Sequence, residues 1–202
     1  MDLPHIGKPA PFFKSKAVLN DKVFDTSLSD YEKKYLILLF FPMNFTYVCP
    51  TELIAFNDRI KDFQELNTNI LACSVESHLS HLKWLSMAHK EGGIRGLQFP
   101  LMADKSMAIS KTYGVLNAED GVSYRAMFII DDKGILRQIT VNDHHVGRNV
   151  SEVCRLIKDI QHTTILNEMT PSTSVSEVTT TNARKSRPMI CLEKSSLREV
   201  IE

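Results

Sequence analysis

An unbroken apolar run at residues 35–41, YLILLFF, constrains the fold of this chain more than any other segment. It is too short to cross a bilayer and is typical of a strand buried on both faces. After it, apolar residues recur at helical spacing, at Leu53, Phe56, Ile60, Phe63 and Leu66. The chain therefore passes from a buried strand into an amphipathic helix, and the segment between them forms a strand-to-helix junction.

The remaining patterns alternate strands and helices. They predict a strand at 70–75, helices at 79–89 and 105–113, and a hairpin of strands 126–131 and 135–140 around the turn residues DDKG. Asn149 and Glu152 stand three residues apart, as at the start of a helix, ahead of further apolar residues at helical spacing. This order predicts an α/β fold in which helices pack on a sheet.

Cys49 lies in the junction, directly before Pro50. Proline suits the first position of a helix because its missing N–H would have no intrahelical partner there. A helix N-terminus presents unpaired N–H groups and partial positive charge, which favour the thiolate, the nucleophilic form of cysteine. Thr46 is close enough for its hydroxyl to meet a substrate oxygen at the sulfur, and Pro42 stiffens the entry to the loop. The alternative is that Cys49 is a small buried apolar residue.

Composition indicates a soluble enzyme without identifying it. The chain has 202 residues, is 43% hydrophobic and carries no formal net charge, so we expect neither nucleic acid nor a membrane as a partner. The N-terminus has no signal-peptide pattern, which predicts a cytoplasmic location. The four cysteines are sparse, as suits free thiols, and Cys73 and Cys154 lie in apolar segments where packing is the expected role.

Two pairs of histidines could in principle bind a metal ion. His78 and His81 are three residues apart on an expected helix, and His144 and His145 are adjacent. Neither pair has a neighbouring cysteine or carboxylate that completes a recognisable ligand set. We therefore expect no metal and no other cofactor.

The pattern Pro-x-x-x-Thr-x-x-Cys is matched at Pro42, Thr46 and Cys49, within the run FTYVCPTEL. Here the chain resembles the peroxiredoxins, specifically the typical two-cysteine class that includes the bacterial alkyl hydroperoxide reductase peroxidase component. The resemblance continues through SHLSHLKW, FPLMADK, YGVL, YRAMFIIDDKGILRQIT and VGR. It implies a thioredoxin-like fold, a central mixed sheet flanked by helices, for a domain at residues 1–165.

The resemblance also implies a function, the thiol-dependent reduction of hydrogen peroxide and small organic hydroperoxides. Cys49 would attack the terminal peroxide oxygen and become a sulfenic acid. Thr46 would hydrogen-bond the bound peroxide, and Pro42 would shield the sulfur from water. Arg125 matches the arginine that contacts both thiolate and peroxide, and its guanidinium stays charged at any physiological pH.

Two further charged residues and the partners follow from the same resemblance. Glu52 would orient Arg125 from the first turn of the Cys49 helix, and Arg148 matches a second arginine near the site. From the residues alone, ordinary helix-end or surface pairing is the alternative for Glu52 and Arg148. The family uses a thioredoxin-like protein or a small thiol as reductant and forms homodimers, which can assemble further into decamers.

The C-terminal end departs from this class, which carries a resolving cysteine in a Val-Cys-Pro context. Thr170 stands at that place here, before Pro171, and a hydroxyl cannot attack a sulfenic acid to make a disulfide. Residues 166–202 are rich in serine and threonine, which predicts a flexible tail. Cys191 in this tail is the candidate resolving cysteine, on its own or a neighbouring subunit; the alternative is that Cys191 has no role.

Two other functions remain open from the sequence. Loss of the usual resolving cysteine lengthens the life of a sulfenic acid, so the protein could be a redox sensor or relay that passes its oxidation to partner proteins. A non-catalytic role as a holdase chaperone is the other alternative.

Overall fold

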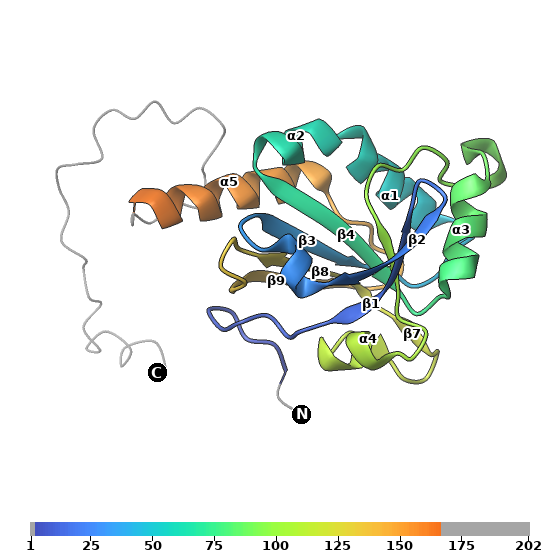
Figure 1. Ribbon diagram of the computed structural model, residues 1–202, viewed down its shortest axis with the longest axis horizontal. Helices are drawn as coiled ribbons and strands as arrows, with labels where there is room; N and C mark the ends of the chain where they lie inside the picture. The colour runs from blue at the N-terminus through green and yellow to red at the C-terminus, as the bar shows by residue number, and fades with distance from the viewer. Residues whose placement is uncertain (1–2, 167–202) are drawn as a thin grey trace, which may run out of the picture. The chain divides into compact units, whose positions relative to one another are not determined.

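A seven-stranded mixed sheet forms the centre of the described part of the chain, residues 3–166 of the computed structural model (Figure 1). The strand order is β2-β1-β5-β4-β3-β8-β9, in which the β3–β4 and β4–β5 pairs are parallel and the other pairs antiparallel. The strands are β1 (Lys14–Leu19), β2 (Lys22–Ser27), β3 (Tyr35–Phe40), β4 (Thr68–Ser74), β5 (Leu101–Ala103), β8 (Arg125–Ile130) and β9 (Leu136–Asn142). A separate two-stranded ribbon pairs β6 (Leu116–Asn117) with β7 (Val122–Ser123).

Helices cover both faces of this sheet. The helices are α1 (Val48–Asp58), α2 (Ile60–Glu65), α3 (His78–Ser86), α4 (Ala108–Thr112) and α5 (Val150–Leu166), with short 3₁₀ helices η1 (Leu28–Tyr31) and η2 (His89–Glu91). Helices α1, α2, α3 and α5 pack on one face and α4 on the other, as Figure 1 shows. The α/β, thioredoxin-like architecture is confirmed.

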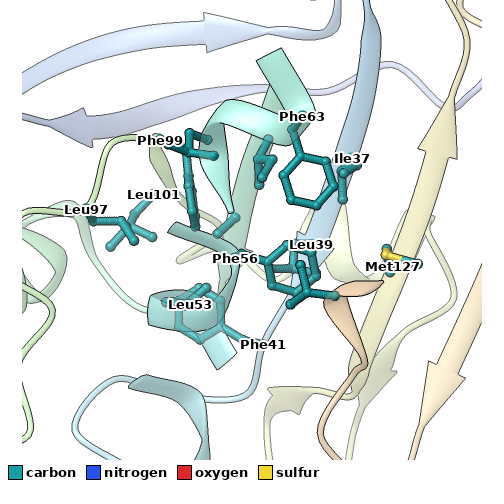
Figure 2. Packing of buried hydrophobic residues seen from close by; sticks show 14 of the residues in the cluster. Ile37, Leu39, Phe41, Leu53, Phe56, Phe63, Leu97, Phe99, Leu101 and Met127 are labelled. Carbon is teal, nitrogen blue, oxygen red and sulfur yellow. The ribbon is translucent and has the colours of Figure 1, made fainter. Parts of the chain in front are cut away.

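Strand β3 separates two hydrophobic cores because its side chains alternate between the faces. Ile37 and Leu39 point into the core beneath α1 and α2, where Phe56 and Phe63 meet them (Figure 2). The intervening residues of β3 belong to the core beneath α4. All six residues of β3 are buried, as the continuous apolar run predicts for a strand covered on both faces.

The hairpin and the final helix also form as predicted. At the β8–β9 turn, Asp131 Oδ1 accepts hydrogen bonds from the backbone N–H groups of Lys133, at 2.9 Å, and Ile135, at 2.8 Å. At the start of α5, Asn149 Oδ1 accepts from the backbone N–H groups of Ser151 and Glu152. These carboxylate and amide oxygens satisfy backbone donors that the turn and the helix leave unpaired.

Three predicted helices have different bounds in the structure. The helix expected through Leu66 is two helices, because Arg59 between α1 and α2 departs from helical geometry with φ −104° and ψ 16°. The helix at 79–89 ends at Ser86, after which Met87 is extended. The helix at 105–113 begins only after Met107, whose φ of 60° is left-handed.

Five strands of the described part, β1, β2, β5, β6 and β7, were not predicted from the sequence. Strand β2 is an edge strand whose residues are mostly exposed, so its pattern lacks a clear apolar face. Strand β5 has only three residues, and β6 and β7 have two each. Segments this short carry too little periodicity to distinguish a strand from a loop.

Candidate active site

Cys49 lies in the first turn of α1, at its second residue. The helix begins at Val48, so the prediction that Pro50 takes the first helical position was wrong by two residues. The first four N–H groups of a helix all lack intrahelical acceptors, and Cys49 still belongs to this turn. Cys49 therefore sits among unpaired N–H groups at the positive end of the helix dipole.

The Cys49 side chain is fully buried, with 0% of its surface exposed. Burial alone would fit the alternative of a small apolar packing residue. The contact of the sulfur with a charged group does not fit that alternative: Arg125 Nη1 donates to Cys49 Sγ at 3.3 Å. A guanidinium in contact with a buried sulfur stabilises negative charge on it, which is the property that a nucleophilic cysteine needs.

Arg125 reaches this place through the pairing of β8 with β3. The antiparallel register sets Leu39 opposite Met127. Arg125 comes two residues before Met127, at the start of β8, and so lies level with the point where β3 leads into the junction. The buried guanidinium also donates from Nη1 to Glu52 Oε2 at 2.6 Å and from Nε to the backbone oxygen of His144 at 2.6 Å. These contacts fix the plane of the guanidinium against the sulfur.

Glu52 joins Arg125 to the second arginine, Arg148. Its Oε1 accepts from the Arg148 backbone N–H at 2.8 Å and from Nε at 2.9 Å, while Oε2 accepts from Nη2 at 3.1 Å. Glu52 is 5% exposed and Arg148 8%, so the alternative of surface pairing is wrong. Burial pushes the pKa of Glu52 up, but the charge and hydrogen bonds of Arg148 and the charge of Arg125 outweigh it and leave the pKa below the usual 4.5.

Arg148 also ties the ends of two strands together. Its Nη1 donates to the backbone oxygens of Phe40 at 2.7 Å and Ala126 at 2.6 Å. The sequence did not predict which carbonyl groups accept hydrogen bonds from Arg148 and Arg125. Every residue carries a backbone carbonyl, and no side-chain pattern distinguishes the acceptors from the rest.

Pro42 and Thr46 lie in the loop between β3 and α1. Pro42 is buried and follows Phe41 directly, close to the end of β3. Thr46 is half-buried, and its hydroxyl donates to the backbone oxygen of Met43 at 3.3 Å. The structure thus brings Cys49, Glu52, Arg125 and Arg148 into one network and leaves the Thr46 hydroxyl bonded within its own loop.

Comparison with known proteins shows the family of the chain. The model of the AhpC/TSA family matches residues 6–139 of the chain. The chain belongs to the AhpC/TSA family. A protein from Cynops pyrrhogaster named peroxiredoxin is 51% identical over 168 residues, which cover 83% of this chain and 84% of the relative. A protein from Echinococcus granulosus named thioredoxin peroxidase is 50% identical over 83% of this chain and 86% of its own length.

Solved structures show the same AhpC/TSA fold. The reduced 2-Cys peroxiredoxin of Plasmodium vivax superposes with a TM-score of 0.83 at 39% identity, covering 86% of this chain and 90% of the other. AhpC of Enterococcus faecalis gives a TM-score of 0.78 at 28% identity, over 84% of this chain and 99% of the other. Both comparisons cover most of the described residues.

The loop between β3 and α1 of this AhpC/TSA family member is anchored by a buried histidine. Asn44 Nδ2 in the loop lies 3.1 Å from His81 Nδ1 and donates to Ser80 Oγ at 2.9 Å, while His81 Nε2 lies 3.3 Å from the Met102 backbone oxygen. Burial lowers the pKa of His81 to about 4, so the ring is neutral at physiological pH. Sequence reasoning considered His81 only as half of a metal-binding pair, although its helical spacing with Trp84 and Leu85 was a signal for burial.

The other cysteines fall into two groups. Cys73 and Cys154 are buried free thiols in the two cores, as expected for packing residues, and burial raises the pKa of both. Thr170 and Cys191 lie outside the described residues, so a resolving role for Cys191 and a flexible tail stay predictions.

Residues 3–166 contain neither a cluster of metal ligands nor a helix that could span a membrane. No three side chains of histidine, cysteine, aspartate or glutamate in this part gather closely enough to hold a metal ion. None of its helices combines the length and the apolar character that a membrane span requires.

Proposed function

We propose that this protein is a thiol-dependent peroxidase that reduces hydrogen peroxide and small organic hydroperoxides at Cys49. The observation that carries the proposal is the contact of Arg125 Nη1 with Cys49 Sγ, at 3.3 Å, inside a buried network that Glu52 holds in place. The names of the relatives, peroxiredoxin and thioredoxin peroxidase, support the same chemistry. No contact in the described part of the chain favours a redox relay or a holdase chaperone.

The first half-reaction uses the Cys49 thiolate as nucleophile. The sulfur attacks the terminal oxygen of the peroxide, an S–O bond forms, and the O–O bond breaks. The leaving hydroxide or alkoxide takes up a proton and departs as water or alcohol, while Cys49 becomes a sulfenic acid. Arg125 stabilises both the thiolate and the charge that develops on the leaving oxygen.

Thr46 and Pro42 act on the substrate side of this step. The Thr46 hydroxyl exchanges its weak bond with the Met43 oxygen, at 3.3 Å, for a bond to the peroxide and so holds it in line with the sulfur. Buried Pro42 keeps bulk water from the site, which strengthens the electrostatic effect of Arg125.

The second half-reaction requires another thiol. Its sulfur attacks the sulfur of the sulfenic acid, water leaves, and a disulfide forms that a further thiol reduces. We propose an external thiol, from a thioredoxin-like protein or a small molecule, or Cys191 in this role. Helix α5 begins shortly after Arg148 and has 17 residues. At a rise of 1.5 Å per residue, it takes the chain about 25 Å from its start before the described part ends. The 25 positions from Leu166 to Cys191 can span up to about 80 Å, so the return to Cys49 is within covalent reach.

We also propose that the protein forms a homodimer through an open sheet edge, with a decamer as the larger assembly, in the cytoplasm. Strand β9 is one edge of the described sheet, and its Val141 is exposed. An edge strand with an exposed apolar side chain can pair with its equivalent in a second copy. Analytical ultracentrifugation of the full chain tests this, because a monomer at micromolar concentration would contradict it.

Peroxide consumption in the presence of excess dithiothreitol tests the enzymatic proposal. We expect turnover to disappear in Cys49→Ser, because the serine hydroxyl stays protonated and is a poor nucleophile. The matched control is Cys154→Ala, which alters a buried thiol of the α5 side of the core and should retain turnover. Turnover that persists in Cys49→Ser would contradict the proposal and favour a different role for the chain.

A further inference from the structure

We infer that His144 is a positioning residue for Arg125, an inference that rests on the proposed function of Cys49. His144 lies in the segment between β9 and α5, and its backbone oxygen accepts from Arg125 Nε at 2.6 Å. Nε and Nη1 belong to one rigid planar group, so the bond at Nε sets the direction in which Nη1 points. Nη1 is the donor that meets the Cys49 sulfur.

The ring of His144 reinforces the position of its own carbonyl. It packs against the ring of Tyr124, with centroids 5.0 Å apart and planes inclined by 34°. Tyr124 directly precedes Arg125 in the chain. His144 therefore holds Arg125 in two ways: its carbonyl oxygen accepts a hydrogen bond from Arg125 Nε, and its ring packs on the residue that precedes Arg125.

The packing of the ring, rather than its polarity, is what acts here. Nε2 of His144 is buried and has no hydrogen-bond partner among the residues that the structure describes. A nitrogen without a hydrogen-bond partner does not stabilise the position of this segment, and its burial costs free energy. An apolar ring of similar size should therefore replace the imidazole in this role.

The turn that contains His144, from Asp143 to Val146, has supports of its own. The backbone N–H of His145 donates to Asp143 Oδ1 at 2.9 Å, and that of Val146 donates to the Asp143 backbone oxygen at 3.0 Å. Removal of the His144 ring should thus leave the turn formed while its carbonyl loses the support that keeps it against Arg125. The expected defect lies in the reactivity of Cys49 and not in the fold.

Single-turnover reaction of the full-length protein with hydrogen peroxide tests the inference. We expect His144→Ala to lower the second-order rate constant about tenfold. This loss is smaller than the one expected for complete removal of an electrostatic donor, about 10²–10³-fold, because Arg125 is still present. His144→Phe keeps the ring packing and should stay within about twofold of the wild type. The matched control is His145→Ala, since this side chain is 93% exposed and its ring bonds to the exposed Asp143, and it too should react at the wild-type rate. A His144→Phe rate as low as that of His144→Ala would overturn the packing account.

A double-mutant cycle separates positioning from a general loss of structure. In an Arg125→Ala background the guanidinium is absent, so we expect His144→Ala to have no further effect on the rate. A full additional tenfold loss would overturn the inference. Tyr124→Ala removes the same ring contact from the other side and should reproduce the tenfold loss, which provides a second test if His144→Ala does not fold.

The two proposals fail in different ways. A wild-type protein that does not react with peroxide contradicts the proposed function. A reactive wild type together with an equally reactive His144→Ala variant leaves the proposed function intact and overturns the role of His144.

Discussion

The guanidinium of Arg125 lies 3.3 Å from the sulfur of Cys49, although 76 positions separate the two residues in the chain. The pairing of β8 with β3 creates this contact, because its register brings Arg125 to the end of β3 from which the chain enters α1. The buried carboxylate of Glu52 then fixes the guanidinium from the same helix that carries Cys49. The environment of the thiol thus depends on a sheet register as much as on the local sequence around it.

Replacing Arg125 should slow the reaction of Cys49 without abolishing the fold. We expect Arg125→Ala to lower the second-order rate constant with hydrogen peroxide by about 10²–10³, as for loss of one preorganised donor to a developing charge. Stopped-flow measurement under single-turnover conditions gives this number. The control is Arg137→Ala, which removes an arginine paired with Asp131 at the β8–β9 turn and should leave the rate unchanged. Equal rates for wild type and Arg125→Ala would refute the role of this contact.

Removing the charge of Glu52 should destabilise the whole protein. Glu52→Gln leaves the buried guanidinium groups of Arg125 and Arg148 without their counter-charge, so we expect the free energy of unfolding to fall by about 3–5 kcal/mol. Urea denaturation followed by circular dichroism measures the loss. Glu152→Gln is the matched control, since Glu152 pairs with Arg155 at the surface and should matter little. A Glu52→Gln protein as stable as the control would show that the network is not held by charge.

His81 should make the stability of the protein depend on pH between about 6.5 and 4.5. Burial lowers the pKa of His81 to about 4, whereas the unfolded chain binds the proton near 6.5, so stability is complete above 6.5 and is lost as the pH falls towards 4. The full loss amounts to about 3 kcal/mol. The pKa of Glu52 is lowered from 4.5, so protonation of Glu52 reduces stability only below that pH. Between pH 6.5 and about 4.5, the loss of stability is therefore assigned to His81.

Unfolding free energies measured across this window test the assignment. We expect His81→Gln, which keeps a hydrogen-bonding side chain but cannot titrate, to show a flatter profile than the wild type. An unchanged slope in the variant would place the titrating group elsewhere.

Thr46 offers a test of substrate positioning. Thr46→Ser keeps the hydroxyl and should retain most of the peroxide rate, whereas Thr46→Val keeps the shape and should lose about 10–10²-fold, as for removal of a hydrogen-bond donor. Alkylation of Cys49 by iodoacetamide, which needs no such donor, should be similar in both variants. If both variants reduced peroxide at the wild-type rate, the hydroxyl would have no part in binding it.

The helix and the strand around Cys49 were predictable because both are local patterns. The apolar run of β3 and the helical spacing after Leu53 follow from periodicity within one segment. The same holds for the turn at Asp131, whose carboxylate satisfies backbone donors two and four residues along the chain.

The contacts that complete the site were not visible in that way. The resemblance suggested that Arg125, Glu52 and Arg148 act together, but the carbonyl groups of Phe40, Ala126 and His144 that hold the arginines depend on sheet register and loop geometry. The break at Arg59 and the late start of α4 were likewise not predicted, because helix propensity is a weak guide to where a helix begins and ends.

The most direct test of the account is the chemical fate of Cys49 after one equivalent of hydrogen peroxide. The reduced full-length protein is oxidised under non-reducing conditions with a sulfenic-acid trap present, and its cysteine peptides are weighed by mass spectrometry. The account predicts oxidation on the Cys49 peptide, as a trapped sulfenic acid or a disulfide, with Cys73 and Cys154 unmodified. An unmodified Cys49, with oxidation on another residue or none at all, would contradict it.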